Sequence, residues 1–333
     1  MRSTDLGRYA LSSCVAAAML AACGGSQPPI GAPGAMPQSR AIVTHASRGG
    51  SWMLPEAKTG DLLYLPGGCS GTCIVSYPAG QVVGHAGPGT YGACGDDKGN
   101  VFIADNDALD EYSHGATQPV NSFSLPGTVR SCGVDSRTGN LAVAFYTSSS
   151  QNNVAIFPDA QAPPEYYSAP EVRTYNCGFD DKGDLFVTGY GSGGVAALAE
   201  LPDGSETFSL INVAPSLDNF VAQVQWDGSY ITLELVGPKK GVSLERITVS
   251  GSSATVVGVT KFKGVSREAT QSWIQNGSIF IPFGTRGDGP YTSKLGIWKY
   301  PRGGKLETKF QHLSAKNTSF TGVGFSPATR RSP

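Results

Sequence analysis

Seven cysteines carry the most distinctive chemistry in this chain, and two of them, Cys69 and Cys73, stand four positions apart. They belong to the flexible run Pro-Gly-Gly-Cys-Ser-Gly-Thr-Cys. In an exported protein such a pair favours a disulfide, provided that the two Cα atoms come within about 7 Å. A redox-active pair would instead need a thiol of lowered pKa, usually in a C-x-x-C motif, which this run does not contain. We therefore predict a structural disulfide between Cys69 and Cys73.

Three further cysteines, Cys94, Cys132 and Cys177, recur in one local pattern, Cys-Gly-x-Asp. Other copies of the pattern carry an apolar residue at the cysteine position: Val224, Trp273 and Val323. Because apolar residues replace cysteine, and free cysteine is itself often buried, we interpret the position as a hydrophobic slot. A zinc site is the competing interpretation, but structural zinc sites favour closely spaced cysteine pairs.

A glycine follows the slot in four copies of the pattern, at Gly95, Gly133, Gly178 and Gly324. Glycine inside a strand often marks a place where another backbone approaches closely. We expect these glycines to allow tight packing of strands near a narrow axis, rather than to bind a phosphate.

Catalytic motifs are missing from the sequence, which contains no G-x-S-x-G, no H-E-x-x-H and no P-loop. His85 could act as an isolated acid or base, but no histidine recurs at a matching position of the pattern. Six aspartates do recur in the first hairpin turns, where Asp commonly accepts hydrogen bonds from nearby backbone: Asp96, Asp97, Asp135, Asp180, Asp181 and Asp227. We predict no catalytic residue, no metal and no cofactor. The sequence therefore favours a protein that is not an enzyme.

Tyrosines and arginines gather in the segments that connect the expected strands. A Tyr ring offers a large contact area, a polar tip and little entropy to lose, which suits recognition. Loops on a rigid scaffold often carry function, although variable surface loops that bind nothing are the alternative. The candidate residues of this ligand face are Tyr91, Arg130, Tyr146, Arg173, Tyr175, Tyr190, Arg286 and Tyr291.

A repeated unit must position these residues. Each Cys-Gly-x-Asp strand leads through a glycine turn to a second apolar strand, and these strands read NVFIAD, NLAVAFY, DLFVTGY, SYITLEL and SIFIPFG. An early partial copy reads DLLYLPG. The turn glycines are 39 to 49 residues apart: Gly60, Gly99, Gly139, Gly183, Gly228 and Gly277. A period of this size indicates a repeat architecture.

A third apolar strand follows in every unit and often ends on an aromatic residue and Pro. The copies read IVSYPAG, LDEYSHG, VAIFPDA, ALAELPDG, VSLERITVSG and GIWKYPRGG. With a fourth strand in each, the units hold four short strands joined by hairpins. Six such units predict an all-β fold, a six-bladed β-propeller.

The units resemble those of NHL-type six-bladed propellers and their gluconolactonase-like relatives, in which a unit reads like GIAVD-x-x-G-N-IYVAD. The resemblance covers about residues 58–327. For the gluconolactonase-like relatives it implies a metal held by converging Glu, Asn and Asp at the channel mouth. This sequence departs from that pattern, because matching residues are missing at the corresponding positions, which counts against lactonase activity.

The ring must also close, and the first unit lacks its innermost strand. The C-terminal segment Thr321-Gly-Val-Gly-Phe-Ser-Pro-Ala resembles a first strand and has no second strand after it. We predict that Phe320–Ser326 supplies the first strand of blade one. This pairing would cover sheet edges that otherwise template aggregation. A loose C-terminal tail is the alternative.

The N-terminus has the pattern of a bacterial export signal. Arg2 and Arg8 precede a short apolar run, which suits a signal peptide better than a membrane span. The run ends in Leu-Ala-Ala-Cys23-Gly24, which resembles the lipobox of bacterial lipoproteins. The resemblance implies cleavage before Cys23 and diacylation of its thiol, and Gly24 implies transfer to the outer membrane if the host is Gram-negative. A plain secretory signal with a chance cysteine is the alternative.

The expected organisation follows from these segments. Residues 1–22 form a lipoprotein signal peptide, 23–51 a flexible tether rich in Gly and Pro, 52–327 the propeller, and 328–333 a disordered tail. The composition agrees, because 44 Gly and 22 Pro disfavour a mainly helical protein. With a net charge of −1, the chain lacks the excess of Lys and Arg that binding to nucleic acid requires.

We therefore predict an extracytoplasmic propeller, lipid-anchored to the bacterial cell envelope, that acts as a binding module through its Tyr-rich loop face. The expected partners are the membrane, through the lipid on Cys23, and a protein, peptide or glycan ligand, but not a nucleic acid. The chain is expected to be a monomer. The alternative function is that of a metal-dependent propeller enzyme resembling gluconolactonases or propeller lyases.

Overall fold

The computed structural model describes residues 51–148, 153–169, 172–191, 194–217, 220–237, 241–265, 271–284, 294–313 and 319–328. Every described residue belongs to one compact unit, 47–333. The predicted signal peptide and Cys23 lie outside the described residues, as do Arg286 and Tyr291. Within the described ranges, no helix is long and apolar enough to cross a membrane.

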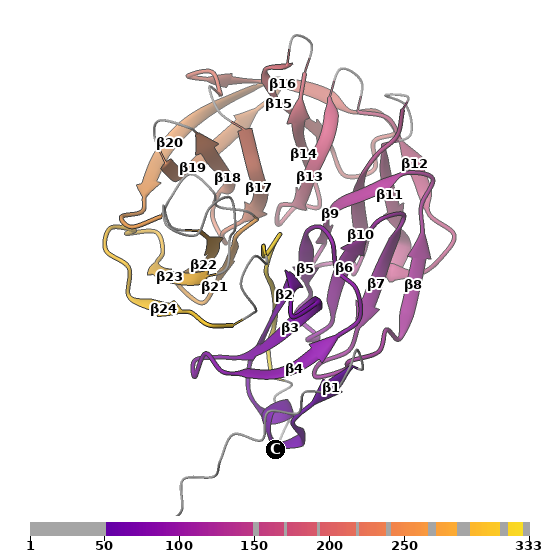
Figure 1. Cartoon of the computed structure of the whole chain (residues 1–333). Helices are drawn as coiled ribbons and strands as arrows, with labels where there is room; N and C mark the ends of the chain where they lie inside the picture. The colour runs from indigo at the N-terminus through magenta and orange to yellow at the C-terminus, as the bar shows by residue number, and fades with distance from the viewer. Residues whose placement is uncertain are drawn as a thin grey trace, which may run out of the picture. The chain divides into compact units, whose positions relative to one another are not determined.

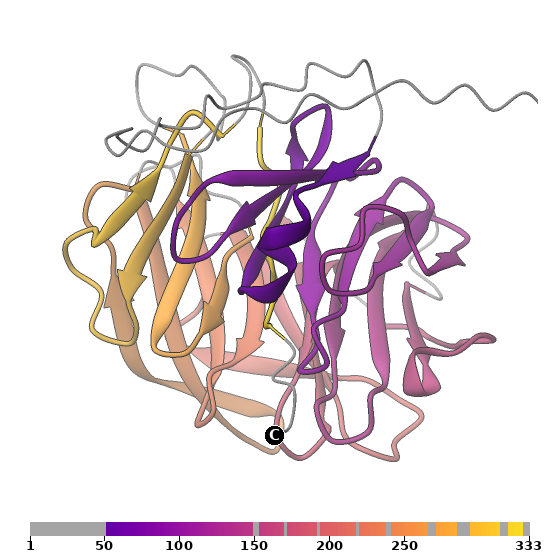
Figure 2. The same cartoon turned by 90° about the horizontal axis from the view of Figure 1, so that it is seen from below.

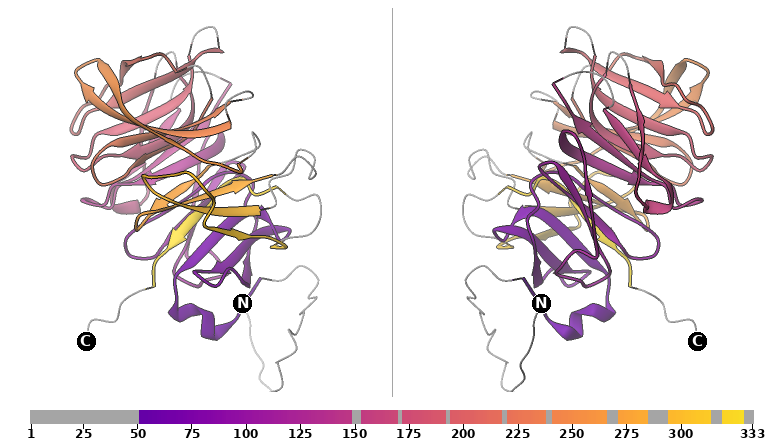
Figure 3. Two further views of the ribbon diagram at one scale, coloured as in Figure 1. Left: turned by 90° about the vertical axis from the view of Figure 1, so that its left-hand side faces the viewer. Right: turned by 90° about the vertical axis from the view of Figure 1, so that its right-hand side faces the viewer.

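The first sheet contains both ends of the described chain, in the order β1-β4-β3-β2-β25. Its strands are β1 (Trp52–Met53), β2 (Leu62–Gly68), β3 (Gly71–Ser76), β4 (Val82–Ala86) and β25 (Gly324–Ser326). β25 runs antiparallel to β2, with Leu62 opposite Ser326 and Tyr64 opposite Gly324 (Figure 3). The prediction that the C-terminal segment completes the first sheet is confirmed.

The next two sheets each consist of four consecutive antiparallel strands. They are β5 (Ala93–Gly95), β6 (Val101–Asp105), β7 (Ala108–Tyr112) and β8 (Asn121–Ser124), then β9 (Thr128–Val134), β10 (Leu141–Tyr146), β11 (Val154–Phe157) and β12 (Glu165–Tyr167). Alternate residues of β10 pack into different apolar clusters: Val143 faces one with Phe102, and Ala142 faces another with Val187. Both faces of β10 are therefore buried, which explains its continuous apolar run.

The longest sheet has eight strands, in the order β13-β14-β15-β16-β20-β19-β18-β17. Its first half is β13 (Arg173–Phe179), β14 (Leu185–Tyr190), β15 (Ala196–Leu201) and β16 (Ser209–Ala214), and its second half is β17 (Phe220–Trp226), β18 (Ile231–Gly237), β19 (Gly241–Ser250) and β20 (Ser253–Lys261). The halves join where β16 runs parallel to β20, from Asn212 opposite Ser253 to Ala214 opposite Thr255.

The last sheet contains β21 (Trp273–Gln275), β22 (Ser278–Phe283), β23 (Lys294–Lys299) and β24 (Thr308–Phe310). In the unit formed by residues 47–333, the sheets are arranged around a common centre, with β5, β9, β13, β17, β21 and β25 nearest to it (Figure 1). Figure 2 shows the same unit from below. Neighbouring inner strands contact one another, as β9 does with β5 and β13. Apolar clusters fill the space between adjacent sheets. The fold is all-β and propeller-like.

The cysteines of the inner strands correct one expectation from the sequence. Cys94, Cys132 and Cys177 are all buried, as a hydrophobic slot requires. However, Cys94 on β5 and Cys132 on β9 form a disulfide, with their Cα atoms 5.6 Å apart. The slots are not independent, because the inner strands converge and bring neighbouring cysteines together. Cys177 is free, and burial raises the pKa of its thiol to about 12.

The predicted disulfide between Cys69 and Cys73 is present, with an S–S distance of 1.96 Å. It closes the turn between β2 and β3.

The inner-strand glycines lie against neighbouring backbone. A Cβ atom on Gly95 would lie 2.2 Å from the Phe325 carbonyl oxygen, and one on Gly178 would lie 2.6 Å from that of Val224. Both contacts are closer than side chains allow, so the predicted role of these glycines in close strand packing is confirmed.

Candidate functional site

The predicted ligand-face residues meet at the ends of the inner strands where those strands begin. Arg130 lies in β9, Tyr175 in β13, and Tyr91 just before β5. The guanidinium carbon of Arg130 is 4.4 Å from the centroid of the Tyr91 ring and 5.5 Å from that of the Tyr175 ring. These are cation–π distances, so Arg130 of β9 links aromatic residues of the two neighbouring sets of strands.

Tyr175 extends this group toward two more rings. Its centroid is 5.6 Å from that of Tyr190 and 5.5 Å from that of Phe220, and Tyr190 stacks on Phe220 at 5.4 Å. Sequence reasoning missed Phe220, because one aromatic residue at the start of a strand carries no distinguishing signal. We call Tyr91, Arg130, Tyr175, Tyr190 and Phe220 the loop-end cluster.

Arg173 and Tyr146 form a second cation–π pair beside the loop-end cluster. Arg173 lies opposite Tyr190 in the pairing of β13 with β14, and its guanidinium carbon is 4.1 Å from the Tyr146 ring centroid. The pair lines a small cavity of about 180 Å³ together with Asn153 and Thr174. Six of the eight predicted residues are therefore brought to one end of the inner strands, while Arg286 and Tyr291 lie outside the described residues.

The polar groups of the loop-end cluster are poised for hydrogen bonding. The Nε atom of Arg130 is buried and has no hydrogen-bond partner. Burial raises the pKa of Tyr190, and the neighbouring Tyr175 raises it further. The Tyr190 phenol is therefore neutral near pH 7 and can donate its proton in a hydrogen bond.

The opposite ends of the inner strands lead into the glycine turns. In four turns, the Oδ1 atom of an aspartate accepts a hydrogen bond from a nearby backbone N–H. The donor and acceptor pairs are Asn100 and Asp96, Arg137 and Asp135, Lys182 and Asp180, and Ser229 and Asp227. The distances are between 2.7 and 2.9 Å. The predicted structural role of these aspartates is confirmed.

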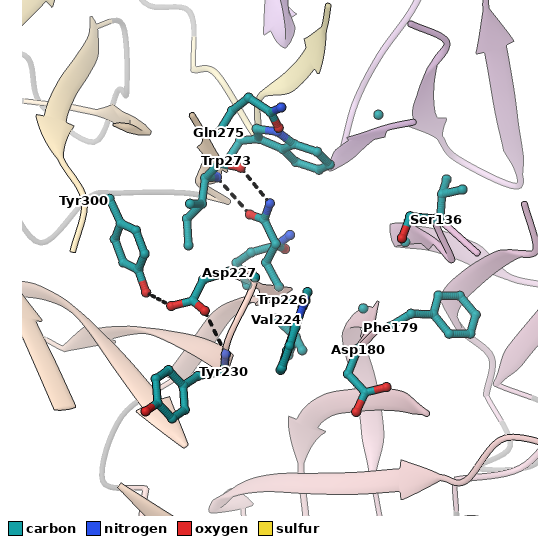
Figure 4. A pocket seen from close by; sticks show the side chains of 18 of the residues that line it. Ser136, Phe179, Asp180, Val224, Trp226, Asp227, Tyr230, Trp273, Gln275 and Tyr300 are labelled. Carbon is teal, nitrogen blue, oxygen red and sulfur yellow. Dashed lines mark hydrogen bonds between the residues drawn. The ribbon is translucent and has the colours of Figure 1, made fainter. Parts of the chain in front are cut away.

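A cavity of about 630 Å³ lies at this hairpin-turn end, among inner-strand residues of several sheets. Its aromatic lining is Phe179, Trp226, Tyr230, Trp273 and Tyr300 (Figure 4). Trp226 projects into the space between Asp227 on one side and Phe179 with Asp180 on the other (Figure 4). Sequence reasoning missed this cavity because it assigned the turns a purely structural role. The run Trp-Asp-Gly-Ser-Tyr, residues 226–230, carried a signal in its two aromatic residues.

Asp227 organises one wall of the cavity. Its Oδ1 accepts the backbone N–H groups of Ser229 at 2.9 Å and Tyr230 at 2.8 Å, and its Oδ2 accepts the Tyr300 hydroxyl. Burial and the adjacent Asp227 carboxylate raise the pKa of Tyr300, so its phenol holds its proton. The bond to Tyr300 holds its phenol against Asp227, and the bond to Tyr230 holds the backbone of the turn.

Two side chains that line the cavity each have a buried polar atom without a hydrogen-bond partner. Gln223 is 4% exposed and its Oε1 has no hydrogen-bond partner, while the buried Nε of Arg246 also has none. Such atoms are costly to leave unsatisfied in a folded protein.

The donor set of the cavity does not fit the metal that the resemblance to gluconolactonase-like propellers implied. Across the described ranges, no three His, Cys, Asp or Glu side chains come together as a metal site. The lining carboxylates of Asp180 and Asp227 instead accept turn amides.

Comparisons with known proteins place the fold but no family. No family model matches the sequence, and no curated protein matches it. A crystal structure of a protein of unknown function from Bacteroides caccae is similar, with a TM-score of 0.57 and 11% identity over 80% of this chain and 99% of that chain. A structure of RRP9 WD40 repeats gives a TM-score of 0.44 at 10% identity, over 66% of this chain and 62% of that one. The similarity to the Bacteroides caccae protein shows a shared fold, and the structure itself shows that this fold is all-β and propeller-like.

Proposed function

We propose that this protein is a binding module that recognises a protein or peptide partner through the loop-end cluster. The observation that carries the proposal is the continuous contact of Tyr91, Arg130, Tyr175, Tyr190 and Phe220, whose closest ring and guanidinium distances run from 4.4 to 5.6 Å. Tyr91 precedes β5 and Arg130 lies in β9, whereas Tyr175, Tyr190 and Phe220 belong to the eight-stranded sheet; all five lie near the starts of inner strands or in the strands paired with them.

The residue types suit a protein partner. Tyr and Arg are enriched at the energetic centres of protein interfaces. Mutual packing of the rings limits their rotamers before a partner arrives, which lowers the entropy cost of binding. Exposed Arg173, held on Tyr146, adds a charged group at the margin of the cluster.

Photo-cross-linking tests this function. A photoreactive phenylalanine at Tyr190 is expected to give a discrete cross-linked product in cells, and Arg173→Ala is expected to reduce its yield. Tyr166, an exposed ring on the outer strand β12, provides the matched control position. Equal product from both positions, or none from Tyr190, contradicts the proposal.

We further propose that the protein is anchored to the bacterial envelope by a lipid on Cys23. The support is the lipobox-like run Leu-Ala-Ala-Cys-Gly after a short apolar segment. Membrane fractionation tests it: Cys23→Ala is expected to release the protein from the membrane fraction, whereas Cys177→Ala should leave it there. Retention of the Cys23→Ala protein in the membrane contradicts the anchor.

We also propose that the ring of sheets consists of six blades. The eight-stranded sheet then represents two blades of four consecutive strands, joined at their outermost strands by the β16–β20 pairing. The six repeat units in the sequence support this count. A crystal structure in which β16 and β20, the outermost strands of the two halves, pair along their whole length would contradict this count.

A further inference from the structure

The cavity at the hairpin-turn end has features of a ligand site that the loop-end cluster does not use. It holds about 630 Å³, within the range of about 300–1,000 Å³ that is typical of small-molecule pockets. We infer that it binds a neutral, polyhydroxylated ring, the chemistry of a saccharide unit.

Gln223 supplies the first polar contact for such a ligand. Its side chain is 4% exposed, it lines the cavity, and its Oε1 has no hydrogen-bond partner. A buried acceptor without a partner is unfavourable, so a ligand hydroxyl that donates a proton to Oε1, once the side-chain amide turns toward the cavity, gains binding free energy.

Arg246 supplies a complementary donor. Its buried Nε has no hydrogen-bond partner, and its guanidinium carbon lies 5.8 Å from the ring centroid of Tyr230, another lining residue. A hydroxyl group both donates and accepts hydrogen bonds, so a ligand with several hydroxyls can satisfy Gln223 and Arg246 together.

The charges of the lining favour a neutral ligand. Asp97, Asp180 and Asp227 line the same cavity as Arg246. An anionic ligand would meet three carboxylates. A cationic ligand would place its charge near the Arg246 guanidinium and could not accept the proton of its Nε.

The aromatic lining suits the apolar face of a sugar ring. Trp226, Tyr230, Trp273 and Tyr300 all line the cavity, and Trp226 projects into it (Figure 4). Flat, rigid rings bury large areas at low cost in conformational entropy. The bond of Asp227 to the Tyr300 hydroxyl holds that ring in place before a ligand enters, and the bond to the Tyr230 backbone N–H holds the turn that carries Tyr230.

Calorimetric titration of the purified full-length chain tests the inference. The probes are glucose, galactose, N-acetylglucosamine and their disaccharides, with choline as the cationic comparator and inorganic phosphate as the anionic one. Because Trp226 and Trp273 are two of only four tryptophans in the chain, saturable binding should also change the tryptophan fluorescence.

The expected result is saturable binding of at least one neutral sugar. Trp226→Ala and Gln223→Met are each expected to weaken that binding about tenfold, because each removes one specific contact. Trp226→Tyr should restore most of the affinity if the ring contact matters, and it also serves where the alanine variant folds poorly. Trp52→Phe, which changes a tryptophan of β1 outside the cavity, is the matched control and should bind like wild type.

Three results would overturn the inference: no saturable binding by any sugar in the panel, sugar binding that Gln223→Met leaves unchanged, or binding of choline or phosphate that depends on Trp226. The test is independent of the proposed partner site. Cross-linking at Tyr190 should not respond to Trp226→Ala, because the two residues lie at opposite ends of the inner strands.

Discussion

Cys94 on β5 is joined by a disulfide to Cys132 on β9, and the bond connects the inner strands of two neighbouring sheets. The two cysteines are 38 positions apart in the sequence, and both are buried at the centre of the ring of strands. The bond therefore adds a covalent link between two units that also contact each other through packing and through a backbone hydrogen bond from Gly92 N–H to the Arg130 carbonyl, at 3.1 Å.

Loss of this disulfide should destabilise the fold markedly. In the chain-entropy description, a loop of this length contributes about 4 kcal/mol to the free energy of unfolding. We expect Cys94→Ala/Cys132→Ala to lower the denaturant midpoint, measured by equilibrium unfolding.

The Cys69–Cys73 disulfide provides the comparison, since its loop spans only four positions. The same description gives about 2 kcal/mol for it, so Cys69→Ala/Cys73→Ala should cost about half as much. If both double variants cost the same, the account in terms of loop length is wrong.

The C-terminal strand should be required for a soluble fold. β25 pairs with β2, whose residues Leu62, Leu63 and Tyr64 are fully buried. A chain that ends at Val323 lacks β25 and exposes this edge, so we expect aggregation in size-exclusion chromatography.

A chain that ends at Ala328 is the matched control for that truncation. It keeps β25 and the hydrogen bond from the Ala328 backbone N–H to Asp61, at 2.8 Å. It should elute and melt like the full chain. Normal behaviour of the shorter chain would show that the closing pair is dispensable.

Close strand packing makes Gly95 sensitive to substitution. An added Cβ would lie 2.2 Å from the Phe325 carbonyl oxygen, so backbone must move. We expect Gly95→Ala to cost about 1–3 kcal/mol of stability, measured by thermal unfolding. Gly60→Ala is the control, because its φ is −111° and nothing lies within 4 Å of its added Cβ. Equal effects of the two changes would refute the packing argument.

Glu234 on β18 should make stability depend on pH. The side chain is fully buried, its Oε2 accepts the Ser272 backbone N–H at 2.9 Å, and its Oε1 has no hydrogen-bond partner. Burial raises the pKa of Glu234 from its ordinary value of 4.5 to about 7. The folded state thus holds the proton more tightly than the unfolded state does.

Because the folded pKa is the higher one, the contribution of Glu234 is fully present below pH 4.5 and is lost as the pH rises to about 7. The loss amounts to about 3 kcal/mol at most. Thermal unfolding across this range should show it, and Glu234→Gln should flatten the profile and raise stability above pH 7. Glu56→Gln, at an exposed position, should leave the profile unchanged. An identical slope in the Glu234→Gln protein would exclude this residue as the cause.

The strands themselves could be predicted from the sequence because their signals are local. The runs NVFIAD and NLAVAFY became β6 and β10, and each lies directly after a glycine turn. The aspartates of these turns accept hydrogen bonds from residues two to four positions away, so short windows of sequence carry the information. The closing strand β25 was also predictable, because the first unit lacked an inner strand.

Only the tertiary structure decided which of these residues meet. The pairing of Cys94 with Cys132, and the contact of Arg130 with Tyr91 and Tyr175, depend on how inner strands of different sheets converge. The cavity likewise joins Gln223, Arg246 and Tyr300, which are far apart in sequence. Hydrophobic periodicity and turn chemistry act over a few residues, whereas convergence at the centre results from the packing of all the sheets around the ring. Local sequence therefore determines the strands, and the closure of the ring determines the sites.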